Sequence, residues 1–181
     1  MEQKAGDGAN QYQAQGNMTI NNNGSKSKLT LLFEKLNEEF NDQNQIQDIV
    51  DELQSYTNER DVIGLEQKLI DGGKPHLFES VSWFKQEYVK KLEKFQFYPS
   101  AQKIHALVLA AVLEKFWNHV SPLIRSNSDE SEILAAISEK VVRPVFELIE
   151  STGCEDIMGL SSVDINGMVY YLTGKCHIKW N

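Results

Sequence analysis

The sequence predicts a mainly α-helical protein, a multi-helix bundle with a short N-terminal β-strand segment and a short C-terminal extended tail. From residue 28 onward, apolar residues recur every three or four positions, which is the period of an amphipathic helix. Before residue 28 and after residue 175 the period is two, which is typical of an extended strand. With 41% hydrophobic and 24% charged residues the composition is that of a globular protein, so we expect most of the chain to be folded.

The chain divides into two parts at residue 27. Its 181 residues fit one ordinary domain with an appendage. Residues 1–27 are rich in Gln, Asn and Gly and have almost no aliphatic side chains. Residues 28–181 are the expected helical domain, in which residues 28–73 form an array of short helices and residues 74–181 form the main helical core.

Two properties of residues 1–27 favour different structures. Their composition is typical of a flexible tail. Residues 11–20, however, alternate between polar side chains and small or apolar ones, which predicts a strand with one apolar face. A lone strand leaves its backbone groups unsatisfied, so this strand would pair with copies of itself or with a partner. In that second interpretation the oligomerising residues are Tyr12, Ala14, Met18 and Ile20.

Three short helical segments are predicted before residue 74. The first has an apolar face made of Leu29, Leu32, Phe33, Leu36 and Phe40. Its acidic pair, Glu38 and Glu39, is expected on the opposite, solvated face. The second segment has Ile46, Ile49, Val50, Leu53 and Tyr56 at helical spacing. The third starts near Arg60 and ends at the pair Gly72 and Gly73, a typical C-terminal cap.

Longer apolar stripes follow Pro75. A helix is predicted from about residue 76 to residue 94, with Lys90, Lys91 and Lys94 in its last turn, where cations interact favourably with the helix dipole. Ser100 is expected to be the N-cap of the most hydrophobic helix, which should be the central core helix.

In the C-terminal third of the chain, the spacing of apolar residues predicts two further helices and a tail. Pro144 is expected to kink one helix or to restart a new one. The last helix runs from about Ser162 to Gly174. Beyond it, apolar and polar residues alternate, so Ile178 and Trp180 are expected to pack onto the fold as an extended tail.

The charge of the chain makes direct nucleic-acid binding an unfavoured interpretation. The formal net charge is −8, whereas binding to a phosphate backbone requires clustered Lys and Arg. Residues 28–98 carry 9 basic and 14 acidic side chains, and residues 99–181 carry 7 and 10, so neither part is basic. No N-terminal apolar segment resembles a signal peptide, and the longest apolar run is too short to span a bilayer. We therefore expect a cytoplasmic protein that does not contact a membrane.

No catalytic, cofactor-binding or metal site is predicted. A phosphate-binding loop needs an upstream glycine and a Ser or Thr after its lysine, and neither Gly73-Lys74 nor Gly174-Lys175 has them. His105 and His119 lie in or near the apolar helix, where a structural role is favoured.

Two cysteines leave two chemical questions open. Cys154, Cys176 and His177 are zinc-type ligands, but their spacing lacks the paired pattern of a zinc site. The sequence does not decide whether they ever bind metal. A single disulfide between the two cysteines is compatible with the sequence, although a reducing compartment is the simpler interpretation.

Two segments carry a family resemblance. KPHLFESVSWFKQEYVKKLEKFQFYPSAQKIHALVLAAVLEKF, residues 74–116, and SSVDINGMVYYLTGKCHIKWN, residues 161–181, resemble the small C-terminal helical domains of bacterial ABC-three-component conflict systems. The resemblance covers residues 74–181. It implies defence against phage or mobile elements, with an ABC ATPase related to chromosome-maintenance proteins, a middle component and an effector that this type of domain connects to the assembly.

The resemblance implies a particular role for this chain. Family effectors place a toxic enzyme domain before the adaptor, but residues 1–73 are too short and motif-poor for most such enzymes. We therefore expect a non-catalytic adaptor or accessory subunit that needs no cofactor, self-associates, and docks onto an ABC/SMC-like ATPase, an effector or a middle component. The alternatives are a metal-dependent nuclease subunit with a spatially assembled site, and a regulatory protein unrelated to defence.

Overall fold

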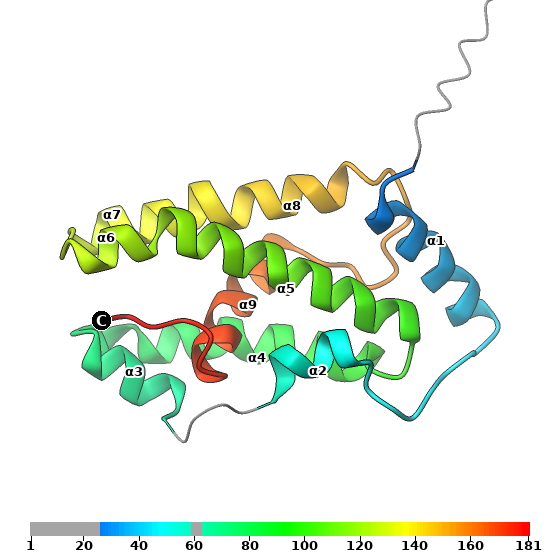
Figure 1. The fold of residues 1–181 in the computed structure, drawn as a ribbon, viewed down its shortest axis with the longest axis horizontal. Coiled ribbons are helices and arrows are strands. Elements are labelled where there is room, and N and C mark those ends of the chain that lie inside the picture. Colours follow the sequence, from blue (N-terminus) through cyan, green and yellow to red (C-terminus); the bar gives the residue numbers. More distant parts are fainter. Residues whose placement is uncertain (1–25, 59–62) are drawn as a thin grey trace, which may run out of the picture.

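The computed structural model describes residues 26–58 and 63–181 (Figure 1). Within these ranges the chain is helical and contains no strand, so the predicted mainly α fold is confirmed. The predicted N-terminal strand lies outside the described residues. The elements are α1 (Lys28–Asn41), α2 (Asp51–Thr57), α3 (Leu65–Asp71), the 3-10 turn η1 (Pro75–Leu77), α4 (Phe78–Phe95), α5 (Pro99–His119), α6 (Ser121–Arg125), α7 (Glu130–Ala136), the π-helical segment η2 (Ile137–Val142), α8 (Arg143–Glu150) and α9 (Ser162–Gly174).

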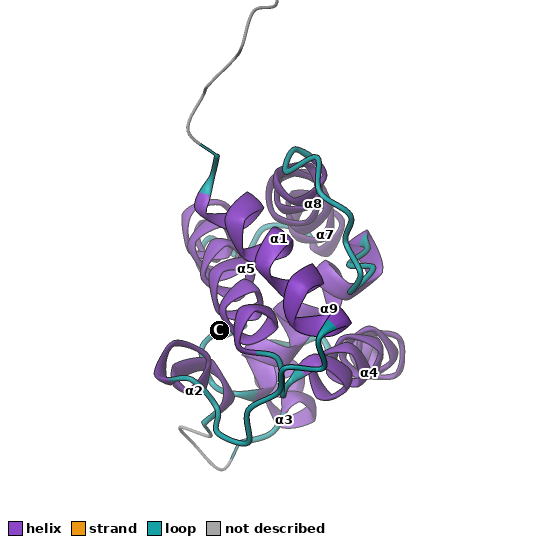
Figure 2. Ribbon diagram, turned by 90° about the vertical axis from the view of Figure 1, so that its right-hand side faces the viewer, coloured by secondary structure: helices purple, strands orange, loops and turns teal. Residues whose placement is uncertain are grey.

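Helix α5 is the central helix of the bundle, as its near-continuous apolar sequence predicts. It contacts α1, α2, α8, α9 and η2 (Figure 2). Because neighbours surround it, its buried residues occupy several faces, among them Ile104, Val108, Leu109 and Phe116. None of the helices in residues 26–58 and 63–181 combines the length and the apolar character needed to cross a bilayer.

Helices α4 and α9 pack closely against each other, and Gly167 on α9 allows this approach. A Cβ atom at this position would lie 2.2 Å from the carbonyl oxygen of Phe84 and 2.8 Å from Cβ of Tyr88, both on α4. Only a residue without a side chain lets the two backbones approach this far. The apolar period of the sequence does not single out this glycine.

Two sequence predictions are wrong where α1 meets α5, namely the solvated position of Glu39 and the N-cap role of Ser100. Glu39, predicted on a solvated face, is only 5% exposed, whereas Phe40 is 42% exposed. The Glu39 carboxylate accepts hydrogen bonds from the backbone N–H of Ser100 (2.9 Å) and from its hydroxyl (2.7 Å). The N-terminus of a helix has unsatisfied N–H groups and a positive dipole end, so a carboxylate from α1 caps α5. The N-cap residue is Tyr98, and Ser100 lies inside the first turn.

The second predicted helix is shorter than its apolar spacing indicates. Helix α2 begins at Asp51, so Ile46 and Ile49 lie in the preceding loop. The buried Gln102 on α5 holds this loop, because its amide nitrogen donates to the carbonyl oxygen of Asp48 (2.9 Å). The same nitrogen donates to the carbonyl oxygen of Gln96 at the end of α4 (2.6 Å). A loop that satisfies its backbone through a buried amide side chain does not need to be helical.

Near Pro144 the helix changes type, and a new α-helical element starts at Arg143, in line with the expected restart. Helix α7 continues through the π-helical segment η2 into α8, with Pro144 in the first turn of α8. A proline removes one backbone donor and displaces the preceding turn, and a wider π turn accommodates that change. The resulting long helical rod lies along α5 (Figure 1).

Candidate functional site

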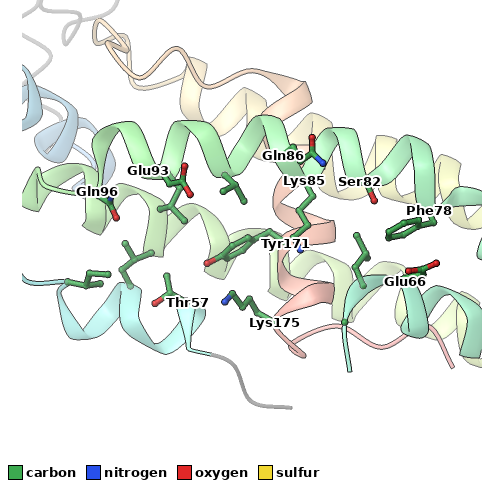
Figure 3. Close-up of a pocket in the computed structure, with 16 residues that line it drawn as sticks. Thr57, Glu66, Phe78, Ser82, Lys85, Gln86, Glu93, Gln96, Tyr171 and Lys175 are labelled. Atoms are coloured by element: carbon green, nitrogen blue, oxygen red, sulfur yellow. The ribbon is translucent and has the colours of Figure 1, made fainter. Parts of the chain in front are cut away.

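A cavity of about 730 Å³ opens between α2, α3, α4 and the C-terminal end of α9 (Figure 3). Most of its wall is apolar and is formed by Ile49, Leu53, Leu65, Phe78, Val89 and Leu92. Polar side chains also line the cavity, namely Thr57, Glu66, Ser82, Lys85, Gln86, Glu93, Gln96, Tyr171 and Lys175. Concave, mostly apolar cavities with few polar groups are the usual form of ligand sites, so this is the candidate functional site.

Helix α4 supplies much of the cavity wall because one of its faces packs into the core and another, mixed face is turned to the cavity. One face, with Val81 and Tyr88, packs into the core. The other presents Phe78, Ser82, Lys85, Val89, Leu92 and Gln96, spaced by three or four residues, to the cavity. Residues at this spacing share one side of a helix. In the sequence the two faces merge into one broad apolar stripe, so the cavity was not predicted.

Two lysines approach the cavity where α9 ends. The Lys85 ammonium nitrogen lies close to Gly174. A Cβ atom added to Gly174 would be 3.1 Å from this nitrogen. Lys175 is the next residue and caps the C-terminus of α9. The carboxyl end of a helix carries partial negative charge, which favours cations at this position. Figure 3 shows Lys85 extending from α4 toward Tyr171. Lys85, Tyr171 and Lys175 each have an interaction partner in the folded chain.

A buried polar cluster lies behind the cavity wall. The Tyr88 hydroxyl is 3.4 Å from Nδ1 of His105, and the ring of Tyr171 packs edge-on against Tyr88 at 5.3 Å between centroids. Burial lowers the pKa of His105 to about 3, with a smaller lowering by Lys91, while Asp164 opposes the shift. Burial likewise raises the pKa of Tyr88 well above its ordinary value. Both groups are therefore neutral near pH 7 and serve packing.

The N-terminus of α9 is fixed by a capping box. The Asp164 carboxylate accepts from the backbone N–H of Ser161 (2.8 Å) and from its hydroxyl (2.6 Å), while the Ser161 oxygen caps the helix. Lys91 on α4 pairs with the same carboxylate at 3.2 Å and also donates to the carbonyl of Gly159. Lys91 thus connects α4 to α9, a role that its place in the predicted basic cluster did not indicate.

The structure places Ile178 and Trp180 in the core, where they are 1% and 2% exposed. The Trp180 ring stacks on Tyr170 at 6.1 Å and 11° and meets Phe116 edge-on. On the other side it lies against Gly72, where a Cβ atom would be 2.6 Å from that of Trp180. The tail therefore packs between α3, α5 and α9.

The zinc-type residues named from the sequence are not gathered in one site. Within the described ranges Cys154 and Cys176 form no disulfide, and their sulfur atoms lie near the carbonyl oxygens of Thr30 and Ile63 respectively. The ring of His177 packs against Tyr56 at 5.6 Å. Among the described residues, no group of three or more His, Cys, Asp or Glu side chains is arranged to hold a metal ion.

Other residues named from the sequence lie apart from the cavity. His119 is exposed at the end of α5. The predicted oligomerisation residues Tyr12, Ala14, Met18 and Ile20 fall outside the described part of the chain. No pattern in the sequence indicates that Lys175 would line a cavity, because its position depends on how α9 packs against α3 and α4.

These features define a small helical domain whose C-terminal tail is part of its core. Residues 64–180 match CTD9, the C-terminal domain 9 of the ABC-three component (ABC-3C) systems, and the chain belongs to this family. The match starts just before α3, earlier than the resemblance at residues 74–181 suggested, and it includes α4, α5, α9 and the tail. No curated protein and no solved structure matches the chain.

Proposed function

We propose that this chain is a non-catalytic adaptor or accessory subunit of a bacterial ABC-3C system that acts in anti-phage defence. The match of residues 64–180 to a C-terminal domain of these systems carries the proposal. In this function the domain docks onto an ABC/SMC-like ATPase, an effector or a middle component of the same system. The complex works in the cytoplasm without direct contact with nucleic acid, in keeping with the net charge of −8.

The use of buried polar groups supports a role without catalysis. Glu39 caps α5, Lys68 donates to the carbonyl of Thr173 at 2.7 Å, Gln102 holds the loop before α2, and Asp164 caps α9. Catalytic acids and bases usually have pKa values tuned to their task and a free position for substrate. These side chains instead satisfy backbone groups at helix ends and loops, which is a structural use.

Self-association is the second part of the proposed function. The alternation of apolar and amide side chains in residues 10–21 favours pairing between copies of the chain. Several copies held together would present several docking domains to one assembly, which raises the apparent affinity for a multisubunit partner.

The experiment that tests the adaptor role is copurification of the tagged chain from its native host. We expect the ABC ATPase or another component encoded with the chain to be recovered with it. The purified chain should stay at background in nuclease and nucleotide-hydrolysis assays with Mg²⁺, Mn²⁺ or Zn²⁺. Turnover that is abolished by a substitution at His105, His119 or His177 would contradict the proposal and support a nuclease subunit.

A further inference from the structure

We propose that the cavity between α2, α3, α4 and α9 binds a small amphipathic carboxylate, a molecule with one apolar chain and one anionic end. This inference goes beyond the adaptor function and is independent of it. It follows from the size of the cavity, the chemistry of its wall and the positions of its charged groups.

Size and lining favour an apolar body for the ligand. The cavity volume of about 730 Å³ lies within the range of small-molecule sites, roughly 300–1,000 Å³. Leu53 on α2 and Val89 and Leu92 on α4 face the same space. Ile49 is 41% exposed at its edge, so a bound alkyl chain would cover apolar surface that the protein itself leaves open to water.

The charged groups favour a single anionic end. Lys85 and Lys175 both line the cavity near the end of α9, and cations beside an apolar wall favour an anion in the cavity. An ammonium group has three donors, so each lysine can bind a carboxylate in addition to its existing partner. Glu66 and Glu93 line opposite ends of the cavity (Figure 3), and their carboxylates oppose a second negative group.

The test measures binding of decanoate, decanol and decyltrimethylammonium to the full chain by calorimetry, each below the concentration at which it aggregates. We expect decanoate to bind most tightly and the cation most weakly. Shortening decanoate to octanoate removes two methylenes, each worth roughly fourfold in affinity. Equal binding of the three head groups, or no binding of any probe, would overturn the proposal.

Two variants and a matched control locate the binding site. Lys85→Met and Lys175→Met each keep a long side chain but lose the ammonium group, and each should weaken decanoate binding by roughly tenfold or more while leaving decanol unchanged. Lys90→Met is the control, because Lys90 lies on the same helix but outside the cavity and pairs with Glu87. If Lys90→Met weakens decanoate binding as much as Lys85→Met does, the assigned site is wrong.

A cavity-filling variant tests the apolar part of the site separately. Val89→Trp places a large ring in the space that an alkyl chain would occupy, so it should abolish binding of both decanoate and decanol. Circular dichroism verifies that the variant keeps its helices. A helical Val89→Trp that binds decanoate as tightly as the parent protein would show that the ligand lies elsewhere, and the inference would be wrong.

Discussion

The indole N–H of Trp180 donates a hydrogen bond of 3.2 Å to the hydroxyl oxygen of Thr173, seven positions earlier in the chain. That hydroxyl in turn donates to the carbonyl of Val169 at 2.9 Å. The Thr173 backbone carbonyl accepts from the buried Lys68 on α3. One residue near the end of α9 therefore connects the tail, α9 and α3.

We predict that Trp180→Ala lowers the free energy of unfolding by roughly 3–5 kcal/mol, the usual loss for a buried aromatic residue replaced by alanine. The substitution removes the stacking on Tyr170 and leaves a cavity beside Gly72. Thermal and urea unfolding measure the loss. Lys179→Ala, at the exposed neighbouring position, is the control and should change little. An unchanged unfolding midpoint for Trp180→Ala would mean that the tail does not stabilise the fold.

We predict that Gly167→Ala destabilises the protein by about 3 kcal/mol or more, since its new methyl group would overlap the Phe84 carbonyl and force α4 and α9 apart. Gly64→Ser is the control, because a Cβ at Gly64 meets no atom within 4 Å and serine is a good N-cap residue for α3. Urea denaturation compares the two variants. If Gly167→Ala is as stable as Gly64→Ser, the close approach of α4 and α9 is not required.

We predict that His105 contributes a pH dependence to stability. Its pKa is about 3 in the folded protein, whereas the ordinary value for a solvated histidine is 6.5, so between these values the unfolded chain binds a proton that the folded chain does not. The contribution of neutral His105 to the free energy of unfolding is complete above pH 6.5 and is lost progressively as the pH falls toward 3. Urea unfolding at a series of pH values measures this loss. As the pH falls, the free energy of unfolding should decrease less for His105→Phe than for the parent protein. Identical pH slopes would contradict this assignment.

The ring of His105 gives a second observable for the same prediction. Its NMR signals should stay those of a neutral imidazole at about pH 5, because the ring is fully buried beside Tyr88.

Local patterns in the sequence predicted most of the fold, because the position of a helix depends mainly on residues that are close together in the sequence. The apolar period located α4 and α9. The pair Gly72 and Gly73 located the end of α3. The failures concern contacts between distant residues. Glu39 looks like any surface acid until α5 places Ser100 against it, 61 positions later. The Gly167 contact with Phe84 and the cavity itself likewise depend on how helices pack, which periodicity does not specify.

We predict that residues 10–21 drive homo-oligomerisation, because their apolar side chains Tyr12, Met18 and Ile20 alternate with polar residues and need a paired strand to be buried. Light scattering should give fewer chains per particle for a chain starting at Ser25 and for Ile20→Asp than for the full chain. Thr19→Ser, at a polar position of the alternation, is the matched control. Circular dichroism should show unchanged helicity in all forms. An equal number of chains per particle in all forms would mean that the segment is only a tail.

The most direct test of the adaptor assignment is the mass of the complex formed when the tagged full chain is coexpressed with the ABC ATPase and the middle component of its own system. We predict coelution in size-exclusion chromatography, with light scattering giving a mass that equals whole-number copies of the subunits. Ile20→Asp should lower the copy number of the chain without abolishing coelution, since docking is assigned to the helical domain. Elution of the folded chain alone, with both partners present and soluble, would contradict the account.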